Sequence, residues 1–258
     1  VPLPEWDYRQ HALLPNFCTV QERLARRAPP CELPAALRRD AQRLRRQFEI
    51  LRPGHGWRRA QPEGEELDLD AWVRHAADCV GSDHSHERGL YQQRARQERD
   101  FACLLLADLS LSTDAWVNNK GRVIDVIRDS LFLFAEALAA TGDRFGLYGF
   151  SSCKRQQVRV QRIKTFGERY SASIRGRINA IKPGYYTRMG AAVRYAAGLL
   201  NQQSATRRLL LLLTDGKPND LDHYEGRYGI EDTRMALLEA RREGLRPFCV
   251  TIDQEAGD

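Results

Sequence analysis

The segment Leu104–Trp116, "LLLADLSLSTDAW", joins an apolar run directly to a cluster of hard oxygen donors. The apolar run begins at Phe101, and an unbroken run of this kind is typical of a strand that is covered on both faces of a parallel sheet. Asp108, Ser110 and Ser112 follow it at intervals of two residues. The pattern predicts a buried strand whose carboxyl end carries a polar loop, which is where open α/β sheets bind ligands.

Strands and helices are predicted to alternate from about Asp100 onward. Apolar or alternating patterns predict strands over 101–108, 144–152, 156–166, 207–214 and 245–253, and helical spacing predicts helices over 116–142, 167–181, 190–201 and 231–244. The alternation in 156–166 indicates an edge strand with one wet face. The fold class is therefore predicted as α/β, with a doubly wound, mostly parallel sheet and helices on both faces.

Residues 1–99 have a different pattern and are predicted to form a mainly helical N-terminal extension packed on a core domain of 100–258. Leu33, Leu37, Leu44, Phe48 and Leu51 form one apolar helical stripe that ends at Pro53. The run Glu5-Trp6-Asp7-Tyr8 is expected to attach this extension to the core.

Composition restricts the class of protein. The chain has 258 residues and a net charge of +6, but no aromatic-plus-basic pattern accompanies the arginines, so we expect a solvated basic surface and no nucleic-acid partner. No apolar run approaches the roughly 20 residues of a membrane helix, so direct membrane insertion is not expected. The six cysteines lack C-x-x-C spacing, and Cys103 and Cys249 fall in predicted core strands, which favours a reducing cytoplasm.

Five hydroxyl and carboxylate side chains are predicted to converge at the carboxyl edge of the sheet. They are Asp108, Ser110 and Ser112, Thr187 at the start of a helix, and Asp215 at the end of a second buried strand. Hard oxygen donors without a Cys/His set suit Mg²⁺, Mn²⁺ or Ca²⁺. Two carboxylates and neutral hydroxyls leave such an ion electrophilic, with a position for a carboxylate of a partner protein. The alternative is that Ser110, Ser112 and Thr187 only shape turns and cap helices.

The trio D-x-S-x-S at 108–112, Thr187 and T-D-G at 214–216 resembles the metal-ion-dependent adhesion site of von Willebrand factor type A domains. The resemblance covers about 100–258. It implies that Ser110, Ser112 and Thr187 ligate the metal directly, whereas Asp108 and Asp215 act directly or through water.

A narrower resemblance rests on "PEWDYR" at 4–9, "DLSLSTDAWV" at 108–117 and the run "TDGKPNDLDHYEGRYGIEDTRMALLEARREGLRPFCVTID" at 214–253. These segments resemble the NorD family of nitric oxide reductase activation proteins and, less closely, the CbbO component of a Rubisco activase. The resemblance implies a non-enzymatic adaptor for a hexameric MoxR-type AAA+ ATPase. The implied client is nitric oxide reductase, through installation of its non-haem iron, or alternatively Rubisco.

Tyr224, Glu225, Arg227 and Tyr228 follow the Asp215 loop and are predicted to contact a partner, because tyrosine and arginine often anchor protein interfaces. The alternative is that the tyrosines pack over the sheet while Arg227 pairs with Glu225 or Asp222.

Two further alternatives concern metal chemistry. Asp108 could be the nucleophile of a Mg²⁺-dependent hydrolase, although the sequence contains no P-loop motif. His84 and His86 form an H-x-H in a polar segment, which is more often solvated than metal-bound.

Overall fold

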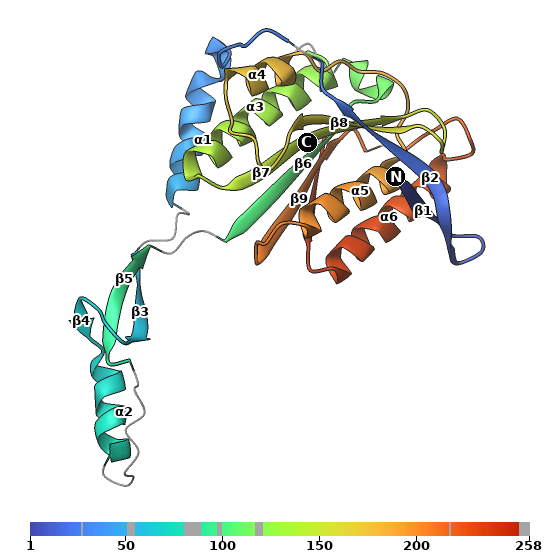
Figure 1. Cartoon of the computed structure of the whole chain (residues 1–258). Coiled ribbons are helices and arrows are strands. Elements are labelled where there is room, and N and C mark those ends of the chain that lie inside the picture. The colour runs from blue at the N-terminus through green and yellow to red at the C-terminus, as the bar shows by residue number, and fades with distance from the viewer. Residues whose placement is uncertain are drawn as a thin grey trace, which may run out of the picture. The chain divides into compact units, whose positions relative to one another are not determined.

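The computed structural model describes residues 1–26, 28–50, 55–79, 89–96, 100–116, 121–216 and 218–252. The chain divides into two compact units (Figure 1). The larger unit contains Val1–Glu49 and Asp100–Asp258, and the smaller unit contains Ile50–Arg99.

A seven-stranded sheet forms the larger unit, with the strand order β1-β2-β8-β7-β6-β9-β10. The strands are β1 Pro2–Asp7, β2 Ala12–Leu24, β6 Phe101–Asp108, β7 Arg144–Ser152, β8 Val158–Lys164, β9 Arg207–Thr214 and β10 Arg246–Thr251. The neighbouring strands β7, β6, β9 and β10 are parallel to one another, and β2 is parallel to β8. Two pairs are antiparallel, namely β8 with β7 and β1 with β2. The sheet is therefore mixed and mostly parallel.

Helices cover both faces of this sheet. Along β6, Leu104 and Leu106 belong to the core cluster that includes the buried residues of α5 (Met189–Asn201) and Ala236 of α6 (Gly226–Arg242). Leu105 belongs to the opposite cluster, with α3 (Val123–Thr141) and α4 (Ala172–Asn179). Successive side chains of a strand point to opposite faces, so an unbroken leucine run fills two cores at once. This confirms the predicted sheet with helices on both faces.

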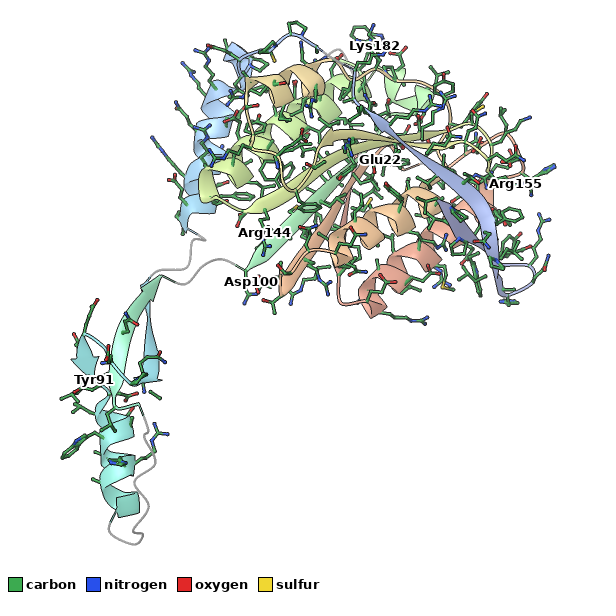
Figure 2. All side chains as sticks on the ribbon, in the orientation of Figure 1. Glu22, Tyr91, Asp100, Arg144, Arg155 and Lys182 are labelled. Atoms are coloured by element: carbon green, nitrogen blue, oxygen red, sulfur yellow. The ribbon has the colours of Figure 1, made fainter. Side chains whose placement is uncertain are left out.

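The carboxyl ends of β6 and β9 lie at one edge of the sheet because these strands are parallel. Their amino ends mark the opposite edge, where Asp100, just before β6, and Arg144, at the start of β7, form an ion pair of 3.7 Å (Figure 2). Polar groups that follow Asp108 and Thr214 are thereby brought to a common edge.

The predicted helical N-terminal extension is wrong, because the chain begins with two strands of the main sheet. In β2, Cys18 and Val20 are buried whereas Thr19 is exposed, which is the alternation of a strand with one covered face. Parallel pairing of 20–24 with 158–162 adds β2 beside β8. The prediction that 156–166 forms an edge strand is wrong for the same reason, since β8 has neighbours on both sides.

Among the described residues of 1–99, the helical structure consists of a short 3-10 turn, Ala35–Leu37, of α1, Arg38–Ile50, and of α2, Leu69–Cys79. Attachment of the N-terminus to the core is confirmed. The Trp6 amide donates to Asp232 Oδ1 of α6 over 2.9 Å, and Glu5 pairs with Arg188. Cys103 is buried as predicted, whereas Cys249 on β10 is exposed, because β10 is the last strand of the described sheet.

The smaller unit contains a three-stranded sheet of order β3-β5-β4 and one helix. Its elements are β3 His55–Gln61, β4 Glu66–Leu67, α2 Leu69–Cys79 and β5 Tyr91–Arg96. His84 and His86 lie outside the described residues. Among the helices of the described chain, none combines the length and apolar character needed to cross a membrane.

Candidate metal centre

Asp108 is fully buried at the carboxyl end of β6. Its Oδ1 accepts a hydrogen bond of 2.9 Å from the Ser110 amide, and its Oδ2 accepts one of 2.9 Å from the Thr214 hydroxyl at the end of β9. The carboxylate therefore links the ends of two neighbouring strands. No lysine or arginine of the described chain forms an ion pair with it.

The two predicted serine ligands lie side by side on the loop after β6. The hydroxyl oxygens of Ser110 and Ser112 are 2.8 Å apart. A short 3-10 turn, Leu111–Asp114, shapes this loop, and the Thr113 hydroxyl donates to the Ser110 carbonyl over 2.7 Å. Ser110 is buried whereas Ser112 is exposed, so the serine pair extends from the protein interior to solvent.

The segment 184–187 crosses the same edge and carries Thr187. The Gly184 amide donates to the Leu109 carbonyl over 2.9 Å, and the Leu111 amide donates to the Tyr185 carbonyl over 2.8 Å. On its other side, the amide of buried Thr187 donates to the Asn219 carbonyl over 2.7 Å. The three loops that carry the predicted ligands are thus joined by backbone hydrogen bonds.

Asp215 follows Thr214 and is close enough for its charge to act on Asp108. Burial and, to a smaller extent, the Asp215 charge raise the pKa of Asp108 from 3.8 to about 6. Hydrogen bonds from Ser110 and Thr214 act in the opposite direction by stabilising the ionised form. Deprotonated Asp108 is therefore destabilised in a setting that a bound cation would relieve.

These residues fit a hard divalent ion. A buried carboxylate, a second carboxylate and two adjacent hydroxyls are donors of the kind that Mg²⁺, Mn²⁺ and Ca²⁺ accept. Within the described ranges, no group of three or more His, Cys, Asp or Glu side chains forms a candidate metal site. The predicted donors are hydroxyl and carboxylate oxygens.

A second buried cluster lies next to Thr187 and was not predicted from the sequence. The guanidinium of buried Arg188 pairs with Glu5 of β1 at 2.5 Å, with Asp220 at 3.2 Å, and with Asp222. Its backbone amide donates to the hydroxyl of Ser152, at the end of β7, over 2.9 Å. We call these residues the Arg188 cluster. The signals in the sequence were an arginine directly after a predicted metal ligand and the expected attachment of the run that contains Glu5 to the core.

The Arg188 cluster also holds the loop that follows β9. Asp220 accepts from the Lys154 amide over 2.8 Å, and Asp222 accepts from the Arg155 amide over 3.0 Å. Asp220 is adjacent to Asn219, whose carbonyl accepts from Thr187. The cluster therefore braces the segment that carries one predicted ligand.

The predicted partner-binding residues differ in their surroundings. Tyr224 is fully buried, and its hydroxyl donates to Asp232 over 2.7 Å, so its side chain faces the core. Tyr228 is partly buried against Tyr8, with ring centroids 6.1 Å apart, and burial raises its pKa. Glu225 and Arg227 are exposed, and the Arg227 guanidinium lies 5.0 Å from the centre of the Tyr8 ring.

Comparison with known proteins identifies the domain. The von Willebrand factor type A domain family matches residues 106–258. Protein NorD of Stutzerimonas stutzeri is 56% identical over 100% of this chain, an uncharacterized protein of Pseudomonas aeruginosa is 57% identical over 99%, and Protein NorD of Brucella melitensis is 49% identical over 98%. The chain spans only 42%, 42% and 40% of these relatives, respectively.

Among solved structures, the PilB minor pilin of Streptococcus sanguinis is similar to 54% of this chain. The match covers 36% of the pilin, with 20% identity and a TM-score of 0.41. The family match includes the buried strand β6 from Leu106 and all five predicted metal ligands. The chain therefore belongs to the von Willebrand factor type A domain family and is a homologue of the proteins named NorD.

Proposed function

We propose that this chain is a metal-dependent binding domain with no catalytic activity of its own. Asp108, Ser110, Ser112, Thr187 and Asp215 would hold Mg²⁺, or Mn²⁺ or Ca²⁺ in its place. The observation that carries this proposal is the buried Asp108 carboxylate, which has a second carboxylate nearby and only hydroxyl and amide hydrogen bonds. A carboxylate in such a site is costly unless it is paired or coordinates a metal.

The arrangement suits binding better than hydrolysis. Both carboxylate oxygens of Asp108 accept hydrogen bonds, and the residue has no exposed surface, which argues against a nucleophile that must reach a substrate. Ser112, in contrast, is exposed. When bound, the ion would supply a Lewis-acidic position for a partner's carboxylate on the solvent side of this loop.

The relatives named NorD extend the proposal to a biological role. We infer that the full-length protein acts as an accessory adaptor in the activation of nitric oxide reductase, together with a MoxR-type AAA+ ATPase. Support comes from 56% identity to one Protein NorD over the whole of this chain. In this role the domain would recognise a carboxylate on the client, and the ATPase would supply the energy that installs the client's non-haem iron.

The test is co-expression of the full-length protein with its MoxR-type ATPase and nitric oxide reductase, comparing wild type with Asp108→Ala. The adaptor proposal expects an iron-deficient, inactive reductase with the variant, while the ATPase is still bound. Asp129→Ala on α3 is a matched control, since Asp129 is a partly exposed aspartate that is not one of the predicted ligands.

Equal iron content and activity with wild type and Asp108→Ala would refute the metal-dependent role. Rubisco reactivation by the same proteins, with no effect on the reductase, would identify the other client. Hydrolysis of phosphate esters by the purified chain, lost in Asp108→Ala, would identify an enzyme instead.

A further inference from the structure

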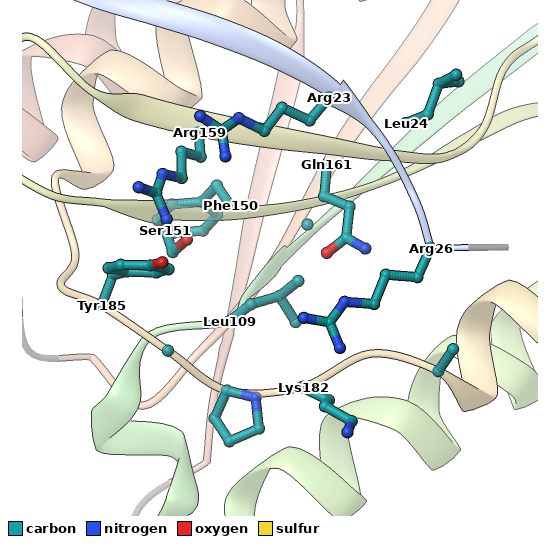
Figure 3. Close-up of a pocket in the computed structure, with 14 residues that line it drawn as sticks. Arg23, Leu24, Arg26, Leu109, Phe150, Ser151, Arg159, Gln161, Lys182 and Tyr185 are labelled. Atoms are coloured by element: carbon teal, nitrogen blue, oxygen red, sulfur yellow. The ribbon is translucent and has the colours of Figure 1, made fainter. Parts of the chain in front are cut away.

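A basic pocket lies beside the metal centre on the sheet face that α3 and α4 cover. Its volume is about 320 Å³. Four cationic side chains line it: Arg23 near the end of β2, Arg26 after β2, Arg159 on β8, and Lys182 after α4 (Figure 3). None of the described residues that line it is acidic. The pocket is therefore lined by positive charge, of which Arg23, Arg26 and Lys182 are exposed to solvent.

These cations are not neutralised by the described part of the chain. None of Arg23, Arg26, Arg159 and Lys182 forms an ion pair with a described carboxylate. Other arginines of this unit are paired, for example Arg162 on β8, which lies 2.8 Å from Glu22. On β8, therefore, Arg162 is paired with a described carboxylate whereas Arg159, which lines the pocket, is not.

Arg159 is held in place but retains unused donors. Its guanidinium carbon lies 3.7 Å from the centre of the Tyr185 ring, and one terminal nitrogen donates to Gln157 over 3.2 Å. Its Nε is buried without a hydrogen-bond partner in the described structure. Stacking leaves the edge of a guanidinium free for an oxyanion, and Figure 3 shows Arg159 above the ring of Tyr185.

The pocket and the metal centre share the same two segments. Leu109 lies in the pocket wall and directly follows Asp108. Tyr185 lines the pocket, accepts a hydrogen bond from Leu111 between the two serines, and precedes Thr187 by two residues. A short peptide segment with one residue at the metal centre could therefore also place a neighbouring residue in the basic pocket.

We propose that this basic pocket binds carboxylate side chains of an acidic segment of the same partner protein whose carboxylate is held at the metal centre. The proposal rests on the proposed function for the position of the first carboxylate. Carboxylates of the segment would pair with Arg26, Arg159 and Lys182, while its aliphatic carbons would pack on Leu24, Leu109 and Pro183, which line the same pocket. The metal and the pocket would together recognise an acidic segment of several residues, where the metal alone would recognise one carboxylate.

An acidic segment fits the pocket better than a phosphate compound. The described lining combines the cations with apolar side chains and contains no helix N-terminus, since α5 begins at Met189, beyond the Gly184–Tyr185 end of the lining. Phosphate sites commonly use successive backbone amides at a helix N-terminus. Here the amide of Gly184 is already bonded to Leu109.

The experiment is a titration of the whole chain with a fluorescent hexaglutamate peptide in the presence of Mg²⁺. The test variant is Arg26→Gln/Arg159→Gln/Lys182→Gln. The control variant is Arg39→Gln/Arg43→Gln/Arg46→Gln, which removes the same charge from exposed positions on α1. We expect the test variant to weaken peptide binding by about tenfold, because three charge-assisted contacts are lost, and the control variant to bind as wild type does.

The single variant Arg26→Gln keeps the test decisive if the triple variant does not fold, since the Arg26 side chain is exposed and its loss should still weaken binding. Equal peptide affinity of wild type and test variant, or no peptide binding by wild type, overturns the proposal. Inorganic phosphate that binds wild type more tightly than the peptide, with the same loss in the test variant, would show a small-anion site and also overturn it.

Mg²⁺ binding separates failure of this proposal from failure of the proposed function. If Asp108→Ala loses Mg²⁺ binding while the pocket variant binds the peptide as wild type does, the metal-site proposal is supported and the proposal for the basic pocket is refuted. If neither wild type nor any variant binds Mg²⁺, but the pocket substitutions still weaken peptide binding in EDTA, the pocket recognises acidic segments and the metal-dependent role is refuted.

Discussion

The Arg188 cluster and the Asp108 centre are both built from buried charged side chains beside the segment that carries Thr187, but their carboxylates are partnered differently. In the Arg188 cluster, the carboxylates of Glu5 and Asp220 both pair with the guanidinium of Arg188. At the Asp108 centre, the buried carboxylate accepts only from a backbone amide and a hydroxyl and has the Asp215 charge nearby.

This difference distinguishes a structural cluster from the proposed binding site. Removing one partner from a buried ion pair leaves an uncompensated charge, so the Arg188 cluster should be essential for folding. Asp108 already lacks a described ion-pair partner, so the fold tolerates it at the cost of a raised pKa. The first cluster would hold the loops in place, and the second would use them to bind a cation.

The largest expected effect comes from breaking the Arg188 cluster. Arg188→Gln should lower the free energy of unfolding by about 3–5 kcal/mol, because Glu5 and Asp220 remain buried without a cation. Urea denaturation followed by circular dichroism measures this loss. Arg227→Gln is the matched control, since Arg227 is exposed and the expected change lies within about 0.5 kcal/mol. A small effect of Arg188→Gln would remove the distinction between the two clusters.

The next effect concerns Asp108 itself. Asp108→Asn should leave stability in EDTA unchanged or higher, because a buried charge is removed, but it should abolish stabilisation by metal. For wild type, Mg²⁺ at about a hundredfold excess over its Kd should add about 2.7 kcal/mol. Thermal unfolding in MgCl₂ and in EDTA measures both quantities. If MgCl₂ raised the unfolding temperature equally in wild type and variant, the metal would bind at another site.

Acidification should weaken metal binding through the same residue. With a pKa of about 6 in the metal-free protein, Asp108 takes up a proton below that pH, and Mg²⁺ must then displace it. Affinity should therefore fall as the pH drops below about 6, with proton release detectable by calorimetry in two buffers of different ionisation enthalpy.

The stability of the metal-free chain depends on pH in the opposite direction from the metal affinity. Because the pKa of Asp108 is raised from 3.8 to about 6, the folded state binds more protons than the unfolded state between these values. Its contribution to stability therefore decreases as the pH rises through this window. A metal affinity that does not change across this pH range would show that Asp108 is not coupled to the ion.

The smallest expected effect is that of a single neutral ligand. Ser112→Ala removes one exposed hydroxyl and no charge, so Mg²⁺ affinity should fall by about tenfold while stability in EDTA stays within about 0.5 kcal/mol. Calorimetric titration measures the affinity. Thr113→Ser keeps the hydroxyl that bonds the Ser110 carbonyl and serves as a control in the same loop. Unchanged affinity in Ser112→Ala would exclude this hydroxyl from the ligand set.

Features that depend on local pattern could be predicted from the sequence. The leucine-rich strands that end at Asp108 and Thr214 are continuous apolar runs, and parallel pairing brings their ends to one edge. Convergence of the predicted ligand loops follows from this topology. Helical spacing likewise indicated α3 and α5.

Features that depend on distant partners could not be predicted. Strand β2 is stabilised by pairing with β8, more than 130 residues away in the chain, and its short alternation carries little information without that neighbour. Arg188 meets Glu5 across 183 residues. An isolated arginine gives no sign of such a partner, and the tyrosine of "HYEGRY" at 224 gives no sign that it is buried.

The most direct test of the account is a Mn²⁺ titration of the chain followed by electron paramagnetic resonance, in which only free Mn²⁺ gives the sharp aqueous signal. We expect wild type to bind a single Mn²⁺ per chain in competition with Mg²⁺, and Asp108→Asn to bind none while remaining folded. Equal Mn²⁺ binding by wild type and Asp108→Asn, or no binding by either, would contradict the proposal that the Asp108 centre is a metal site.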